Sequence, residues 1–524
     1  MLTPPGTRAA ADWLLTAQQR GNPDTSLDAR HADGRAFTSG NEVTPLIHGR
    51  TYFAALYKAV SATRAGDLVL FTDWRGDPDE QIVEGVYVSA LLCHAAERGV
   101  AVRGLVWRSH LDVLRFSSEE NRRLGDQIEA AGGQCLLDMR VRPGGSHHQK
   151  MVVVRYHDHP ERDVAFLGGI DLCHSRRDDQ RHRGDPQDVD MAGEYGDHPP
   201  WHDIQVAVRG PAVGDIEATF CERWTDPAPL SHNPLRLARS WLDREQLKGR
   251  PLPAPGDAPP PCGGQAVQVL RTYPYRRWSY PFARAGERSI ARAYTKALRR
   301  ARSLIYLEDQ YLWSAEVASA FAEALRREPG LRMIAVVPMY PDVDGATARA
   351  ETYGRTQALR LLHAAGRERF AVYGLENPAG RPVYVHAKVC IIDDTWSCVG
   401  SDNLNLRSWT HDSELSCAIV DVDGGTGFGY GLRRLLAREH LDLDGTHDEW
   451  LRDPHAMFDA YRRTAAVLDA WHDGPPGPPR PLGRLRAYRP PRLGPLRRSL
   501  AAARYRYLCD PDGRPHALKR RHDF

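Results

Sequence analysis

The chain has 524 residues, of which 42% are apolar and 26% charged, and its formal net charge is +3. This length allows two or three domain-sized cores, and the composition excludes a disordered or fibrous chain. No apolar run approaches the roughly 18 residues of a membrane span, and no basic start followed by an apolar core marks a secretion signal.

The cysteines indicate a reducing, intracellular compartment. Nine of them stand singly, without any C-x-x-C pair. Such a pattern predicts reduced, mostly buried thiols, and neither a disulfide framework nor a zinc site. We therefore expect a cytoplasmic protein, with any membrane contact peripheral.

The first part of the chain predicts alternating helices and strands. Apolar residues recur at helical spacing over 9–19, 52–62, 81–98 and 117–131, and short buried runs that read as strands cover 68–71, 102–107, 135–139 and 148–154. Alternation of this kind is typical of α/β layers with a parallel or mixed sheet.

The second part repeats this order. Helices are predicted over 287–302, 315–327 and 347–365, and strands over 304–307, 331–338, 370–373 and 384–392. Leu68 precedes His148 by 80 residues, and Leu304 precedes His386 by 82. Matching intervals between matching elements indicate an internal duplication.

Two Pro-rich stretches suggest boundaries. We expect a first half over 1–250, a Pro/Gly-rich linker over 251–264, a second half over 265–474 and a Pro/Arg-rich basic tail over 475–524. The tail has thirteen Lys and Arg against three Asp and Glu. It is either a solvated tail or a segment drawn to an anionic membrane surface, to which each basic residue adds about 1 kcal/mol. Nucleic acid would also suit its charge.

One motif occurs twice. His386 and Lys388 stand two apart in a predicted strand, so both side chains lie on one face, and the turn with Gly400, Ser401 and Asn403 follows. The earlier copy has His148 and Lys150, followed by a turn with Gly168, Gly169 and Asp171. An imidazole beside a fixed cation suits an anionic phosphate centre.

This pattern resembles the phospholipase D superfamily, whose signature is a duplicated H-x-K-x4-D motif followed by a GG or GS turn with Asn or Asp. The second copy is complete and ends at Asp393, whereas Arg155 replaces the usual Asp in the first. The segments Trp201-His202-Asp203, Gly168 to Cys173 and Leu307 to Tyr311 also look like those of eukaryotic-type phospholipases D. The resemblance implies two α/β/α sandwiches with mixed sheets around a pseudo-twofold axis.

The resemblance also implies roles for residues. One histidine attacks phosphorus and the other protonates the leaving group; the family's usual order makes His148 the nucleophile and His386 the acid, although the sequence does not separate the two roles. Lys150 and Lys388 would hold phosphoryl oxygens, and the orienting acids would pair across the axis, Glu414 with His148 and Asp203 with His386. The predicted phosphate ligands are Asp171, Ser401 and Asn403. The predicted structural residues of the motifs are Gly168, Gly169, Gly400 and Asp393.

Other histidines receive no role. His147 should face away from His148, and His157, His159, His174 and His182 are expected to be loop residues. No H-E-x-x-H or C-x-x-C spacing appears, so we expect no metal and no cofactor.

Function follows from the resemblance. We expect a phospholipase D acting on glycerophospholipid and giving phosphatidate and a free alcohol, with transfer to another alcohol as a variant of the same reaction. The alternatives are a cardiolipin or phosphatidylserine synthase-like phosphatidyltransferase, a metal-independent nuclease, and a non-enzymatic membrane scaffold supported by Arg155 alone. Without its tail the chain carries a net charge of −7, which follows from a total of +3 and a tail of +10, and this disfavours a nucleic-acid substrate.

Overall fold

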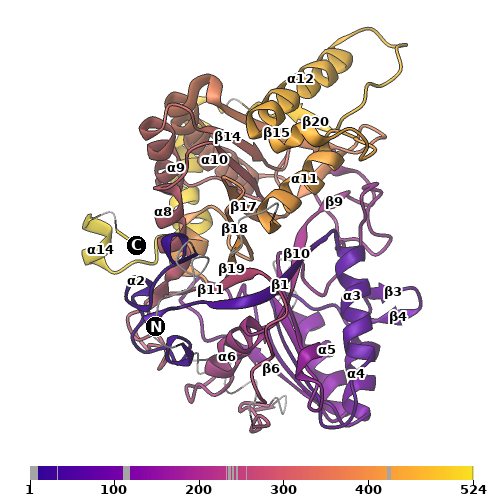
Figure 1. Cartoon of the computed structure of the whole chain (residues 1–524), viewed down its shortest axis with the longest axis vertical. Helices are drawn as coiled ribbons and strands as arrows, with labels where there is room; N and C mark the ends of the chain where they lie inside the picture. The colour runs from indigo at the N-terminus through magenta and orange to yellow at the C-terminus, as the bar shows by residue number, and fades with distance from the viewer. Residues whose placement is uncertain are drawn as a thin grey trace.

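A computed structural model describes residues 10–524 except 32–33, 110–117, 232, 234–237, 239–240, 243–245, 255, 422–426, 492 and 522. The two halves lie one above the other, the first in indigo to magenta and the second in orange to yellow (Figure 1). Within the part of the chain so described, every helix is too short or too polar to cross a bilayer.

The first half contains a seven-stranded mixed sheet. Its strands follow the order β1 (Thr38–Ile47), β10 (Ile204–Arg209), β8 (Val164–Gly168), β7 (Met151–Arg155), β2 (Leu68–Asp73), β5 (Ala101–Trp107) and β6 (Gln134–Asp138). Strands β2, β5 and β6 run parallel, and the other pairs are antiparallel. Helices α3 (Gly49–Ser61), α4 (Val88–Glu97) and α5 (Ser118–Ala130) bury apolar side chains on one face, and α6 (Ala212–Trp224) on the other.

The second half repeats this sheet strand for strand. The order is β11 (Gln265–Tyr273), β19 (Glu414–Asp421), β18 (Trp396–Gly400), β17 (Lys388–Ile392), β13 (Leu304–Asp309), β14 (Arg332–Val336) and β15 (Phe370–Glu376). Helices α8 (Ser289–Leu298), α9 (Ala315–Arg327) and α10 (Ala346–Gly366) cover one face, and α11 (Phe428–His440) packs on the other. The predicted duplication and the α/β/α layering are confirmed.

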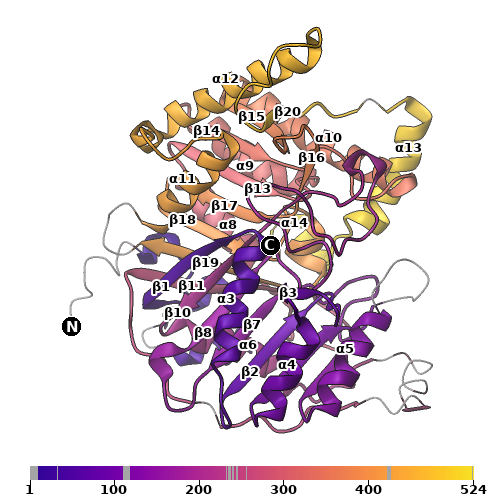
Figure 2. The same ribbon diagram turned by 90° about the vertical axis from the view of Figure 1, so that its right-hand side faces the viewer.

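The halves share one core. Strand β1 pairs with β11, which joins the two sheets (Figure 2). The apolar faces that carry α6 and α11 belong to a single buried cluster that contains strands of both halves. Because the strands are buried on both faces, their sequences are nearly continuous apolar runs rather than alternating ones.

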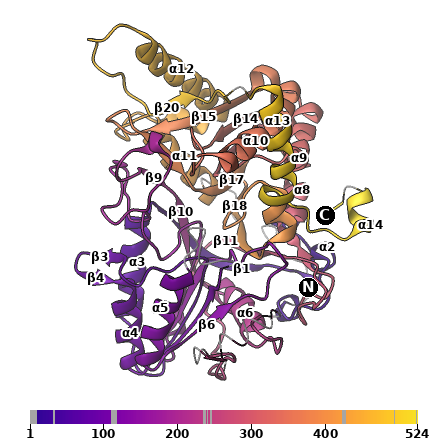
Figure 3. The ribbon, with the colours of Figure 1, turned by 180° about the vertical axis from the view of Figure 1, so that it is seen from behind.

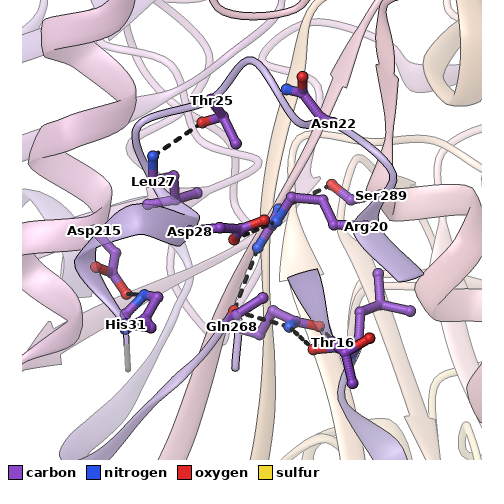
Figure 4. A network of polar contacts seen from close by, with 12 residues as sticks. Thr16, Arg20, Asn22, Thr25, Leu27, Asp28, His31, Asp215, Gln268 and Ser289 are labelled. Carbon is purple, nitrogen blue, oxygen red and sulfur yellow. Dashed lines mark hydrogen bonds and ion pairs between the residues drawn. The ribbon is translucent and has the colours of Figure 1, made fainter. Parts of the chain in front are cut away.

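The N-terminal segment also ties the halves together (Figure 4). Arg20, at the end of α2 (Ala17–Arg20), donates to Asp28 at 2.9 Å and to Glu287 of the second half at 3.0 Å. His31 lies 3.0 Å from Asp215 of α6 in the first half. These buried contacts bring 10–31 into the body of the protein.

The structure corrects the prediction of a separate basic tail over 475–524. Most of this segment is folded into the second half. After α12 (Pro454–Asp473), strand β20 (Leu485–Ala487) pairs with β15, and Arg480 and Arg486 bind Glu376 of that strand at 3.0 Å. Helix α13 (Pro495–Arg504) packs on α10 (Figure 3), and α14 (His516–Arg521) lies near the C-terminus. Part of the predicted positive charge is therefore neutralised inside the fold.

Two predicted helices begin later than expected. Residues 81–87 form a hairpin of β3 (Gln81–Val83) and β4 (Val86–Tyr87), turned at Gly85 with a φ of 74°, before α4 starts. Residues 287–288 form β12, and α8 follows. In both places strand pairing overrides the helical spacing of the apolar residues.

Candidate active site

The two motif histidines occupy equivalent positions in the two halves. His148 precedes β7, and His386 lies between β16 (Pro382–Val385) and β17. Each backbone N–H donates across to the other half: that of His148 to the carbonyl of Ser413 at 2.9 Å, and that of His386 to the carbonyl of His202 at 2.7 Å. Both imidazoles line one cleft with a volume of about 510 Å³.

These backbone bonds place an acid beside each imidazole. Glu414 follows Ser413, and its Oε2 lies 2.8 Å from Nδ1 of His148. Asp203 follows His202, and its Oδ2 lies 2.6 Å from Nδ1 of His386. The contacts cross between the halves in the arrangement that the resemblance implies. With Nδ1 engaged, Nε2 is the nitrogen of each ring that remains for substrate.

The two lysines are buried just behind the histidines. Nζ of Lys150 lies 3.4 Å from Oδ1 of Asp171, and Nζ of Lys388 donates to Oε1 of Gln310 at 3.1 Å. Burial, together with repulsion from Lys150, lowers the pKa of Lys388 to about 8. Lys388 is thus still mostly charged at neutral pH.

Electrostatics distinguish the imidazole of the second motif. Burial lowers the pKa of His386 well below its usual value, and the cations of Lys388 and Arg176 lower it further. Burial also raises the pKa of Asp203. His386 is therefore held as a neutral imidazole, which donates from Nδ1 to Asp203.

Asp171 remains ionised although it is buried. Burial opposes its charge, but Lys150 and Arg176 hold its pKa well below the usual range. The neighbouring carboxyl of Asp73 behaves oppositely: burial and the charge of Asp171 raise its pKa well above the usual range. Of these residues Asp171 and Arg176 line the cleft, at its first-half end.

The Gly-rich turns bring strands and acids close together. A Cβ at Gly169 would lie 2.2 Å from a carboxylate oxygen of Asp203, and one at Gly400 would lie 1.8 Å from the hydroxyl of Ser416. Gly168 has a φ of 158°, and a Cβ there would lie 2.5 Å from the backbone carbonyl oxygen of Ile204 in β10. These positions therefore exclude any side chain.

The predicted phosphate ligands separate into two kinds. Asp171 and Asn403 line the cleft. Ser401 is instead fully buried, and its hydroxyl donates to Glu414 and accepts from the N–H of Leu415 at 3.1 Å. Its contacts make Ser401 a support for the acid rather than a residue of the cleft wall.

The departure at Arg155 is compensated within the fold. Asp393 accepts hydrogen bonds from the backbone N–H groups of 302–304 at 2.7–2.9 Å, which anchors the start of β13. In the first half Asp67 makes the reciprocal contact, accepting from the N–H of His157 at 2.8 Å. Arg155 instead binds Asp163 at 2.6 Å and Glu217 of α6.

Several residues of the cleft were not predicted. Trp201 lies against the ring of His386 with centroids 4.9 Å apart, and Arg176 lies over Trp201 at 4.0 Å. Trp74 and Trp107 stack at 5.5 Å on the other side, beside His148. Further aromatic residues of the wall are Tyr311, Trp313 and Tyr384. Arg176 lies eight residues after Gly168, and nothing in the local sequence distinguishes it from its neighbour Arg177.

Comparisons with known proteins show what this chain is similar to. The family model described as phospholipase D matches residues 77–249, and the one described as cardiolipin synthase, PLD-like domain, matches residues 294–424. Phospholipase D alpha 2 of rice (Oryza sativa subsp. japonica) is 27% identical over 512 residues, covering 73% of this chain and 61% of that protein. Phospholipase D1 of Saccharomyces cerevisiae is 25% identical, covering 79% of this chain and 30% of that protein.

A solved structure shares the fold. The crystal structure of phosphatidylserine synthase from Haemophilus influenzae has a TM-score of 0.53 and 13% sequence identity, and the match covers 83% of this chain and 96% of that one. The chain spans less than two thirds of the rice and yeast relatives. Each matched region contains one His-x-Lys pair and one of the two acids, and the chain belongs to the phospholipase D superfamily.

Proposed function

We propose that this protein hydrolyses the head-group phosphodiester of glycerophospholipids through a covalent phosphohistidine. The observation that supports it most is the pairing of two imidazoles on one cleft, each held by a buried carboxylate from the opposite half. That arrangement supplies a nucleophile and a proton carrier to one phosphorus atom. The products are phosphatidate and a free alcohol.

In the first step, Nε2 of His148 attacks phosphorus and the bond to the head-group oxygen breaks. The leaving oxygen takes a proton from Nε2 of His386. Glu414 keeps the proton on Nδ1 of His148 and offsets the positive charge of the phosphohistidine. Lys150, Lys388 and Arg176 would stabilise the phosphoryl oxygens, and electrostatic stabilisation of this kind is usually the largest catalytic contribution.

The low pKa of His386 fits this role once substrate is present. Lys388 and Arg176 lower that pKa in the free cleft. A phosphodiester brings a negative charge between these cations and the imidazole, so its binding raises the pKa and loads the proton. In the second step water attacks phosphorus and gives its proton to His386, and the bond to His148 breaks.

The shape and surface of the protein favour a lipid. Stacked tryptophans and tyrosines line the cleft beside its charged floor. At its rim, Leu508 lines the cleft and is 59% exposed. Exposed apolar and basic residues continue along α13 and the turn after it, namely Leu496, Arg497, Arg498, Leu500, Arg504 and Tyr507.

We propose that this surface, called here the rim helix face, contacts the anionic membrane that holds the substrate. An amphipathic helix with basic residues around an apolar stripe lies in a lipid interface. Because Arg504 and Leu508 also line the cleft, docking there would bring the cleft mouth to the head groups. The membrane contact first expected of a free tail is thereby assigned to a folded helix.

Transfer to an alcohol is a second candidate. The second-half match to a cardiolipin synthase model favours it. The catalytic residues are the same, and an alcohol replaces water in the second step. Ethanol added to the assay would then divert phosphatidate to phosphatidylethanol.

Choline release from phosphatidylcholine vesicles tests the proposal. His148→Asn and His386→Asn should each lower the rate by at least about 1,000-fold, whereas His157→Asn, at an exposed imidazole, should leave it unchanged. Failure to cleave phosphatidylcholine, phosphatidylethanolamine or phosphatidylglycerol, with single-stranded DNA cut instead, would replace the lipid proposal with a nuclease.

A further inference from the structure

Behind the candidate active site, four side chains from separate segments converge. They are His48 at the start of α3, His182 in a loop, His202 in β9 (Trp201–His202) and Glu439 in α11. The potential ligand atoms of this cluster, the His3Glu cluster, all lie within 4.8 Å of one another. His48, His182 and His202 are each at most 4% exposed.

Three imidazoles meet a single carboxylate in this cluster. Nε2 of His48 lies 2.7 Å from Oε2 of Glu439, and Nε2 of His182 and Nδ1 of His202 lie 2.9 and 3.5 Å from Oε1. Nδ1 of His202 is fully buried and makes no hydrogen bond. If the cluster held only hydrogen bonds, Nδ1 of His202, which faces the other three side chains, would have no partner. An unpaired polar atom is costly in a protein interior.

We propose that His48, His182, His202 and Glu439 bind one structural zinc ion. Three imidazole nitrogens and one carboxylate oxygen form a ligand set that zinc takes in tetrahedral geometry. With zinc–ligand bonds of about 2.0–2.1 Å, neighbouring ligand atoms of a tetrahedron lie about 3.3 Å apart. Measured to Oε1 of Glu439, the separations are 2.9 Å for His182 and 3.5 Å for His202, which bracket that value, while His48 lies nearer Oε2.

The surroundings of two ligands support the assignment. Metal-bound histidines usually donate their second N–H to a carbonyl or carboxylate, which fixes the ring. His182 donates from Nδ1 to the carbonyl of Trp201 at 3.0 Å, and His202 donates from Nε2 to Glu308 at 2.6 Å. Glu308 is held in turn by His440 at 2.8 Å.

The proposed ion would cross-link the halves next to the catalytic groups. Three ligands belong to the first half and Glu439 belongs to the second. His202 precedes Asp203, and the N–H of His48 donates to the carbonyl of Asp203 at 2.9 Å. Asp203 holds the ring of His386. Zinc would therefore stabilise the joint and position Asp203 without touching substrate.

Zinc content tests this proposal independently of the lipid activity. Untagged protein made in zinc-supplemented medium should hold about one tightly bound zinc per chain by mass spectrometry. The zinc content of His182→Ala should be at least tenfold lower, whereas that of His157→Ala, at an exposed imidazole, should be unchanged. His148→Asn should also keep zinc although it is expected to lose activity, so the two proposals fail separately.

Cobalt substitution identifies the ligands directly. Cobalt in the wild-type protein should give the strong visible absorption of a tetrahedral site, and His182→Cys should add a sulfur-to-cobalt charge-transfer band. If His182→Ala fails to fold, the wild-type protein still decides: removing the metal should lower its melting temperature, and zinc but not magnesium should restore it. Less than a tenth of an equivalent of zinc, with no tetrahedral cobalt spectrum, would overturn the proposal and leave a proton-bridged network.

Discussion

Replacing Arg155 with Asp restores the family pattern in the sequence but should destabilise this protein. Arg155 is buried between Asp163 and Glu217 and donates to the carbonyl of Asp257 at 2.6 Å. Arg155→Asp removes the shared cation and adds a third carboxylate. Asp67 already ties the start of β2 to the end of β7, the junction that Asp393 ties between β13 and β17 from the opposite strand, so the new side chain gains no comparable partner.

The size of the effect follows from these contacts. Removing one partner of a buried ion pair costs about 3–5 kcal/mol. For a unit the size of the first half, each kcal/mol lowers the melting temperature by about 2–4 °C, so a fall of at least about 6 °C is expected. Calorimetry at several pH values measures it. Arg209→Ala, which breaks the more exposed pair with Glu42, is the control and should cost about 0–1 kcal/mol.

The pH dependence checks the electrostatic cause. Burial already raises the pKa of Asp163 to about 6, and burial also raises that of Glu217. Without Arg155 both values rise further above those of the unfolded chain, so the folded variant binds protons more readily than the unfolded one. Its deficit should shrink as pH falls from 8 to 5. A deficit that is equal at both pH values, or wild-type stability, would refute the reasoning.

Three further predictions concern activity. The rate of phospholipid hydrolysis should fall as pH rises through about 8 because Lys388 loses its charge. Lys388→Arg should flatten this alkaline limb of the pH–rate profile, and an unchanged limb in the variant would contradict the role of Lys388. Glu414→Gln should lower kcat by up to about 10,000-fold with the fold intact, since the amide stabilises the wrong tautomer of its histidine; a loss below tenfold would remove its orienting role. Leu500→Asp should reduce hydrolysis of anionic vesicles severalfold but spare a short-chain monomeric phospholipid, whereas Leu482→Asp, at a similarly exposed leucine outside the rim helix face, should spare both; equal losses on both substrates would argue against docking by the rim helix face.

Local patterns in the sequence were enough to predict the strands that follow His148 and His386, although both histidines lie just before those strands and not within them. Each His-x-Lys pair stands against a continuous apolar run, and the turns that follow contain glycines with no space for a side chain. The duplicated order of elements was likewise visible, because each part of the chain predicts four strands in the same order, and the first strand starts 80 residues before His148 in one part and 82 residues before His386 in the other. The pairing of Glu414 and Asp203 across the halves came only from the resemblance, since no local signal encodes a contact 266 or 183 residues away.

Other features depend on tertiary contacts that the sequence does not reveal. Strand β20 has only three residues within a Pro- and Arg-rich segment, and its pairing with β15 decides that it is a strand. Ser401 was predicted to bind phosphate, but the close approach of Glu414 takes its hydroxyl. His48 and Glu439 are 391 residues apart, so the His3Glu cluster lacks any ligand spacing that a motif search would detect.

Trapping the covalent intermediate tests the central claim most directly. A phospholipid that is labelled at phosphorus and carries p-nitrophenol as its head group, which can leave without a proton from His386, would be mixed with the His386→Asn variant. The mixture would be quenched with denaturant at neutral to alkaline pH, and the labelled peptide sequenced. If the halves act together on one phosphorus, label should accumulate on His148, and adding His148→Asn should abolish it. Label on a residue outside the cleft, or undiminished choline release by the double variant, would contradict the account.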